Sequence, residues 1–192
     1  TSTMLSNQFM FKKMAYDPQK DLVPVARVCW APIVLVVNEK LPARNLPELI
    51  AYIKSQKSKL SYGSYAIGSQ GHLVLATLSI LADADMTHIA YKGEAPMVQD
   101  LVGGQLMIGI GSILSLKQHI DSGKLRAIAF TGHNRVPALN DIPTFMELGY
   151  KQEAFTIAGW LGVAATGGTP AAVVQKLGEE IRKAVLTREV NA

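Results

Sequence analysis

The middle of the chain alternates between short apolar runs and stretches with apolar residues at helical spacing. The runs favour strands at Leu60–Gly63, Met86–Tyr91, Leu106–Ile110 and Leu125–Thr131. The stretches before and between them favour helices at 45–56, 71–81, 95–102 and 114–122. Strands that alternate with helices build parallel sheets with right-handed crossovers. We therefore expect a doubly wound parallel α/β sheet with helices on both faces.

Apolar segments also flank this region on both sides. Residues 23–38, VPVARVCWAPIVLVVN, are typical of one long or broken strand that is buried on both faces. After Thr131, a polar, proline-bearing stretch with a short helix near 144–148 leads to the apolar strand FTIAGWLGVAA. An amphipathic helix follows, with Thr169 as its expected N-cap. The pattern predicts a self-contained α/β unit over 40–155 and a second unit built from the flanks.

The composition is that of a globular protein, with 48% of the 192 residues hydrophobic and 18% charged. A net charge of +4 without a basic block favours a small anionic ligand and argues against nucleic acid as a partner. No apolar run is long enough to span a membrane, and the opening TSTMLSNQFM has no pattern of a secretory signal. The single cysteine, Cys29, lies in an apolar strand, so we expect a buried thiol.

The stretch LSYGSYAIGSQGHL, residues 60–73, joins a strand to a helix through glycines and hydroxyl residues. It is not a P-loop, because no Lys-Ser/Thr pair follows the glycines, and the glycine spacing does not fit a dinucleotide site. No Gly-x-Ser-x-Gly elbow occurs there either. The N–H groups at a helix N-terminus suit a carboxylate. A loop with a serine cap and no ligand would explain the same pattern.

The sequence offers little for catalysis. The four histidines, His72, His88, His119 and His133, have no spacing typical of metal ligands, and we expect no metal or cofactor. Ser112 follows a strand, as loop residues commonly do. The ends of parallel strands are where α/β ligands bind, and here they carry Ser64, 91–93, 111–112 and 131–132. Lys92 is the cation among them, either a surface lysine or the partner of an acid. Binding without turnover fits these residues best.

Several motifs follow one another through nearly the whole chain: YKG, LVGGQ, SGKLRA and an R-x-PAL-x-DIPT pattern. With them the chain resembles the Bug family of extracytoplasmic solute receptors, the binding proteins of tripartite tricarboxylate transporters. The resemblance implies a two-lobed, Venus-flytrap periplasmic binding protein that holds a small carboxylate and catalyses no reaction. It implies a complete second lobe at 40–155 and a partial first lobe from 1–39 and 156–192. Transporter subunits in the membrane are the implied partners and the periplasm the implied compartment.

The resemblance also implies where a ligand would bind. Ser64 and the loop 65–71 match the family's helix-end carboxylate site, and 1–3 match a hydroxyl-rich loop of the first lobe. The predicted ligand-binding residues are Thr1, Ser2, Ser64, Tyr65, Gly68, Ser69, Gly71, His72, Lys92, Ser112 and Thr131. Many members carry an Asp where this chain has 111–112, so the partner for a ligand ammonium is lost and an amino-acid ligand is disfavoured. Members usually also carry further sequence before and after the matched stretch.

The expected function is therefore the capture of a small mono- or dicarboxylate for transport. One alternative is the effector-sensing domain of a transcriptional regulator, which has a similar two-lobed fold and a DNA-binding motif upstream. Another is a hydrolase that uses Ser64 or Ser112, for which the sequence shows no base and no oxyanion hole. We also expect the apolar faces of 33–37 and 160–163 to lack partners, which favours oligomerisation through these strands or weak stability.

Overall fold

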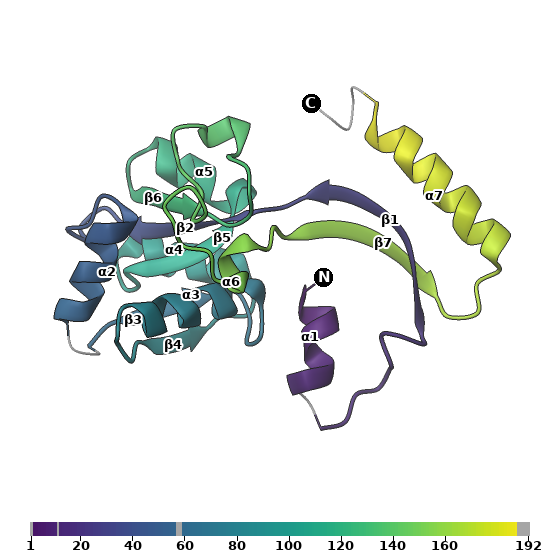
Figure 1. Cartoon of the computed structure of the whole chain (residues 1–192), viewed down its shortest axis with the longest axis horizontal. Helices are drawn as coiled ribbons and strands as arrows, with labels where there is room; N and C mark the ends of the chain where they lie inside the picture. The colour runs from purple at the N-terminus through teal and green to yellow at the C-terminus, as the bar shows by residue number, and fades with distance from the viewer. Residues whose placement is uncertain (1, 11, 57–58, 188–192) are drawn as a thin grey trace. The chain divides into compact units, whose positions relative to one another are not determined.

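The computed structural model describes residues 2–10, 12–56 and 59–187 (Figure 1). The chain forms two units, unit 1 from Thr1–Ala31 and Trp160–Ala192 and unit 2 from Pro32–Gly159. These boundaries differ from the expected breaks after residues 39 and 155. The first boundary differs because the strand at 33–38 pairs within the sheet of unit 2, which the sequence pattern did not reveal.

Unit 2 is built on a mixed sheet, not the expected all-parallel one. Its strands are β2 (Ile33–Asn38), β3 (Ser61–Ser64), β4 (Thr87–Ala90), β5 (Ile108–Ser112) and β6 (Leu125–Phe130). Their order is β4-β3-β5-β2-β6. β3 runs parallel to β4 and β5, whereas β2 is antiparallel to both of its neighbours, β5 and β6. The four strands expected from the alternating pattern are all present.

The apolar segment 23–38 divides into two strands of different sheets. All six residues of β2 are buried, so the expectation that 33–37 would lack a partner is wrong. Its side chains alternate across the sheet, as strand geometry requires. Leu35 and Val37 pack on one face of the sheet, and Val34 and Val36 pack on the other.

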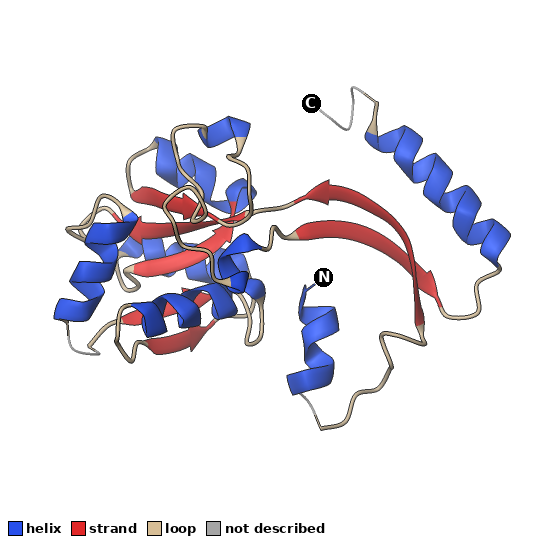
Figure 2. Ribbon diagram, in the orientation of Figure 1, coloured by secondary structure: helices blue, strands red, loops and turns tan. Residues whose placement is uncertain are grey.

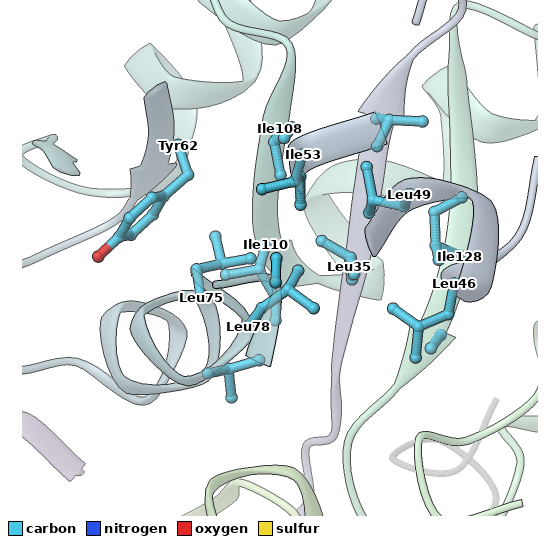
Figure 3. Close-up of a cluster of buried hydrophobic side chains, with 14 of the residues drawn as sticks. Leu35, Leu46, Leu49, Ile53, Tyr62, Leu75, Leu78, Ile108, Ile110 and Ile128 are labelled. Atoms are coloured by element: carbon cyan, nitrogen blue, oxygen red, sulfur yellow. The ribbon is translucent and has the colours of Figure 1, made fainter. Parts of the chain in front are cut away.

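The helices of unit 2 cover both faces of this sheet (Figure 2). They are α2 (Leu46–Ser55), α3 (Gln70–Leu81), α4 (Glu94–Gly103), α5 (Ile113–Asp121), the 3-10 turn η1 (Pro137–Leu139) and α6 (Glu153–Thr156). Side chains of α2 and α3 pack with Leu35 (Figure 3), and those of α4 and α5 pack with Val34. The helix expected near 144–148 is instead a turn, in which Thr144 bridges to Phe130.

The local signals for these helices are visible in the sequence. Asn45 caps α2, with its side-chain oxygen accepting from the Glu48 N–H at 2.9 Å and its amide donating to the Glu48 carboxylate at 2.7 Å. Ser69 caps α3 by accepting from the His72 N–H at 3.2 Å. Caps of this kind satisfy donors that the first turn of a helix leaves without partners. The capping residues therefore fix where α2 and α3 begin.

Unit 1 is small and open. It contains α1 (Ser2–Met10), β1 (Leu22–Trp30), β7 (Trp160–Thr166) and α7 (Ala171–Val185). β1 and β7 pair antiparallel, and α7 lies against β1. The α1 helix was not anticipated from the sequence. Pro170, not Thr169, is the N-cap of α7, because the Thr169 hydroxyl donates back to the Thr166 carbonyl.

The two strands of unit 1 expose much of their apolar surface. Trp30 is 58% exposed and Leu161 is 51% exposed, which agrees with the exposure expected for 160–163. Cys29 is exposed as well, so the prediction of a buried thiol is wrong. A two-stranded sheet covers only part of its own faces, and an apolar position in it is not automatically a core position. Oligomerisation through these strands stays a prediction.

Leu35 is fully buried in the central strand, so its truncation tests how strongly unit 2 depends on β2. We expect Leu35→Ala to lower the free energy of unfolding by about 2–5 kcal/mol, because a cavity remains in a close-packed core. Urea unfolding followed by circular dichroism measures the change. Ile80→Ala is the control, since Ile80 is 77% exposed on α3 and its truncation should change little. A loss at Leu35 no larger than that at Ile80 would contradict this account.

Candidate functional site

The candidate site lies at one edge of the unit 2 sheet, called here the strand-end edge. The C-terminal ends of β3, β4, β5 and β6 meet there, and β2, being antiparallel, begins there. Thr131, which follows β6, is hydrogen-bonded to the first residue of β2. It is buried, donates its N–H to the Ile33 carbonyl at 3.0 Å, and accepts the Ile33 N–H on its hydroxyl at 3.2 Å. Thr131 therefore holds the edge in shape.

The loop between β3 and α3 satisfies its own backbone donors. The Gly68 N–H donates to Nδ1 of His72 at 3.1 Å, and the Gly71 N–H donates to the Tyr65 hydroxyl at 3.3 Å. The Tyr65 ring reaches this position because residue 71 has no side chain. A Cβ there would lie 3.0 Å from Cε1 of Tyr65 and 2.8 Å from Cγ2 of Ile110. The first turn of α3 is thus covered by a phenol oxygen.

Ser64 is fully buried behind this loop and does not point to solvent. Its hydroxyl lies 3.0 Å from the Ala66 carbonyl, to which it donates, and 2.8 Å from Nε2 of His88. One hydroxyl hydrogen cannot serve both partners, so a bond to the carbonyl requires Nε2 of His88 to carry a hydrogen and donate to Ser64. Ser64 therefore shapes the loop, whereas the sequence suggested a donor that faces the ligand.

Three rings form a column beside Ser64. His88 stacks on Tyr62, with the ring centroids 5.0 Å apart, and on His72, with centroids 3.8 Å apart and planes inclined by 9°. Burial, and to a smaller extent the neighbouring His72, lower the pKa of His88 to about 4. Burial also lowers the pKa of His72. Both imidazoles are therefore neutral at pH 7, as His72 must be for its Nδ1 to accept from Gly68.

A carboxylate side chain occupies the next strand end. Glu94, the first residue of α4, accepts the Ser112 N–H on Oε1 at 2.9 Å. Its Oε2 accepts the Ser112 hydroxyl at 2.6 Å and also the Ser115 hydroxyl. Ser112 is the residue before α5, so Glu94 places a negative charge at the N-terminus of that helix, where the helix dipole favours it.

The structure brings six of the predicted ligand-binding residues together between the end of β3 and the first turn of α3: Ser64, Tyr65, Gly68, Ser69, Gly71 and His72. Ser112 and Thr131 lie at the same edge on other strands. Lys92 is exposed, and none of the ion pairs between described residues includes it, so it is a surface lysine. Ser2 begins a helix in unit 1, which corrects the expected loop. Thr1 lies outside the described residues.

Sequence reasoning missed two residues of this region, His88 and Glu94. His88 lies in β4, and Glu94 begins α4, the next helix. β4 pairs with β3 in parallel register, with Tyr62 opposite His88 and Ser64 opposite Ala90. The pairing of β3 with β4 was the missing information, because no local spacing connects Ser64 with His88. Glu94 follows the YKG motif, and no local spacing connects it with Ser112, which lies 18 residues further along the chain.

Among the described residues, no group of three or more His, Cys, Asp or Glu side chains lies close enough together to hold a metal ion. No helix in the described part of the chain is long and apolar enough to cross a membrane.

The family model "Tripartite tricarboxylate transporter family receptor" matches residues 1–190. The chain belongs to this family. It is 34% identical to protein BugT of Bordetella pertussis over 181 residues, which are 94% of this chain and 55% of BugT. The chain thus spans about half the length of that curated relative. The predicted family is confirmed.

Solved structures of relatives confirm the fold. The chain matches the periplasmic binding protein BugD with a TM-score of 0.86 and 33% identity, covering 99% of this chain and 62% of BugD. It matches an R. palustris protein solved with adipate with a TM-score of 0.85 and 31% identity, covering 94% of this chain and 60% of that one. The α/β fold of periplasmic binding proteins, predicted from the resemblance, is therefore confirmed.

The histidine column predicts a pH-dependent stability. A histidine whose pKa is lower in the folded protein binds fewer protons there than in the unfolded chain, so the free energy of unfolding rises with pH between the two values. For His88 that window runs from about 4 to its ordinary value of 6.5. We expect stability to fall as pH falls through it, by less than the roughly 1.4 kcal/mol per pH unit of one full proton, because solvent screens half-exposed rings.

Urea unfolding at pH 7, 6, 5 and 4.5 measures this dependence. His88→Phe keeps an aromatic ring in the column and removes the titrating group, so its slope should be smaller than that of the parent protein. His133→Phe serves as the control, because His133 is exposed and lies outside the column. Equal slopes in the parent and in His88→Phe would contradict the predicted contribution of His88.

Proposed function

We propose that this chain is the ligand-binding part of a periplasmic receptor that captures a small carboxylate for a tripartite tricarboxylate-type transporter. The observation that carries the proposal is the Tyr65 hydroxyl at the first turn of α3, bonded to the Gly71 N–H. The family match supports it, and so does the related structure solved with adipate. Unit 2 would form one lobe and unit 1 part of the other. Among the two-lobed alternatives, the match favours a receptor over a regulator domain.

Tyr65 is suited to donate a hydrogen bond to a carboxylate. Burial raises the pKa of the Tyr65 phenol, and the nearby charge of Glu94 raises it further, against the lowering by the Gly71 N–H. The phenol therefore keeps its hydrogen at pH 7. Its oxygen accepts from Gly71, which polarises the O–H group. A ligand oxygen at this point would meet a hydroxyl donor in the field of the α3 N-terminus.

Tyr65→Phe removes this donor and leaves the ring in place. We expect it to weaken binding of a small carboxylate by about tenfold or more, because a hydrogen bond to a charged acceptor is worth roughly 1.5–3 kcal/mol. Isothermal calorimetry on the full-length protein measures it, with the ligand chosen by a thermal-shift screen of carboxylates, sugars and amines. Tyr52→Phe on α2 and Lys92→Ala are the controls and should change little.

Two results would reject the carboxylate proposal. One is stabilisation by sugars or cationic amines and by no carboxylate. The other is a Tyr65→Phe affinity equal to that of Tyr52→Phe. Ser64→Ala is expected to cost about tenfold as well, through loss of the loop geometry that Ser64 holds.

We infer that the chain catalyses no reaction. Ser64 and His88 lie at hydrogen-bond distance, as a nucleophile and base do, but Ser64 is fully buried. Ser112 is bonded to the Glu94 carboxylate, and its N–H is occupied by the same group. Neither serine presents a reactive oxygen beside free oxyanion donors.

An ester screen tests this inference. p-Nitrophenyl acetate and butyrate are turned over by many activated serines, and we expect no rate above that of the buffer. Ser64→Ala and Ser112→Ala should match the parent protein in the same assay. A hydrolysis rate in the parent that either substitution abolishes would overturn the inference.

A further inference from the structure

The Glu94 carboxylate occupies the kind of position at which a second ligand carboxylate would bind. Three donors converge on it: the Ser112 N–H, the Ser112 hydroxyl and the Ser115 hydroxyl. Hydroxyl and backbone donors at a helix N-terminus are the usual partners of a bound anion. Here the anion is supplied by the protein itself, and both of its oxygens are used.

The fold is arranged to admit this side chain. Residue 111 is a glycine whose added Cβ would lie 3.4 Å from the Glu94 carboxyl carbon and 3.3 Å from Cδ1 of Leu116. A Cβ at position 111 would therefore be in contact with the Glu94 carboxyl group and tight against Leu116. With glycine there, the half-buried Glu94 side chain reaches Ser112 and closes this end of the site.

Glu94 lies within reach of a small ligand held at Tyr65. β3 and β5 pair in parallel with Gly63 opposite Gly109, so Ser112 lies two residues beyond the neighbour of Ser64. A strand rises about 3.3 Å per residue, and neighbouring strands lie about 4.8 Å apart. The Cα atoms of Ser64 and Ser112 are therefore roughly 8 Å apart. The distal carboxylate of a short dicarboxylate bound at Tyr65 would thus arrive beside the charge of Glu94.

The same edge exposes apolar side chains. Ile67, in the loop before α3, is 57% exposed, and Leu114, in the first turn of α5, is 89% exposed. Ile67 belongs to the same loop as Tyr65, and Leu114 lies two residues after Ser112. Exposed aliphatic groups among a few hydrogen-bond donors suit a ligand with one polar end and an apolar body.

We propose that Glu94 is a specificity-determining residue that excludes a second carboxylate, so that the ligand is a monocarboxylate with an apolar remainder. This rests on the proposed carboxylate-binding function. The Glu94 carboxylate and a second ligand carboxylate would repel each other more strongly in this half-buried place than in water. A dicarboxylate therefore binds with its second carboxylate unpaired or does not bind. Ser112 and Ser115 are positioning residues that hold the Glu94 carboxylate in place.

Hexanoate and adipate provide a matched test, because they have equal chain length and differ in one carboxylate. Calorimetry on the full-length protein should give tighter binding of hexanoate by tenfold or more. Glu94→Gln removes the charge with little change of shape, and should reduce that ratio at least tenfold by improving adipate binding. Glu39→Gln is the control. It removes one charge just beyond the end of β2, at the opposite edge of the sheet, and should leave the ratio unchanged.

Different outcomes of this experiment would reject the inference and the proposed function. If neither acid nor any other carboxylate binds, the proposed receptor function is wrong, and the inference that rests on it is wrong as well. If adipate binds the parent protein as tightly as hexanoate, or Glu94→Gln leaves the ratio unchanged while its thermal melt is normal, the inference alone is overturned. Ser115→Ala keeps the charge and removes one donor, so it should retain the preference for hexanoate. The ratio in the parent protein decides the question even if Glu94→Gln does not fold.

Discussion

Unit 2 depends on the pairing of one buried strand, β2, with neighbours on both sides. β2 runs against β5 and β6 and contributes side chains to the core on both faces of the sheet. Its first residue, Ile33, makes two hydrogen bonds with Thr131, the residue that follows β6. The same strand therefore joins the two halves of the core and fixes the edge at which the candidate site lies. A site formed at strand ends is only as rigid as this central strand.

The polar groups at this edge follow from a constraint on helix ends. The first N–H groups of a helix lack partners within the helix, and leaving a buried donor without a partner costs roughly 1–3 kcal/mol. At α3 the partners are the Ser69 hydroxyl and the Tyr65 phenol, both neutral. At α5 the partner is the charged Glu94. The two helix ends thus differ in charge although the donors at each end have partners. Under the proposed function, this difference would leave the α3 end open to an anion and the α5 end closed to one.

Much of the fold could be predicted because its signals are local. The caps Asn45 and Ser69 mark the starts of α2 and α3, and the four strands between the helices follow from apolar runs. The place of β2 could not be predicted. A fully apolar strand such as 33–38 is compatible with either unit and with either direction of pairing. The prediction that Cys29 is buried was wrong for a related reason. An apolar pattern does not show how many layers of structure cover a strand.

The candidate site was predicted in part. The loop 64–72 was found from its glycines and hydroxyls, but the direction of each hydroxyl depends on residues distant in sequence. The Ser64 hydroxyl points inward because it lies at hydrogen-bond distance from His88 on β4. The Ser112 hydroxyl is hydrogen-bonded to Glu94, which begins α4. Donors that are hydrogen-bonded to water or to the protein must exchange those bonds when a ligand enters. In the proposed site, Tyr65 would make that exchange because its oxygen would keep the hydrogen bond from Gly71 while its hydrogen turned to the ligand. A second ligand carboxylate would instead bring a negative charge close to that of Glu94.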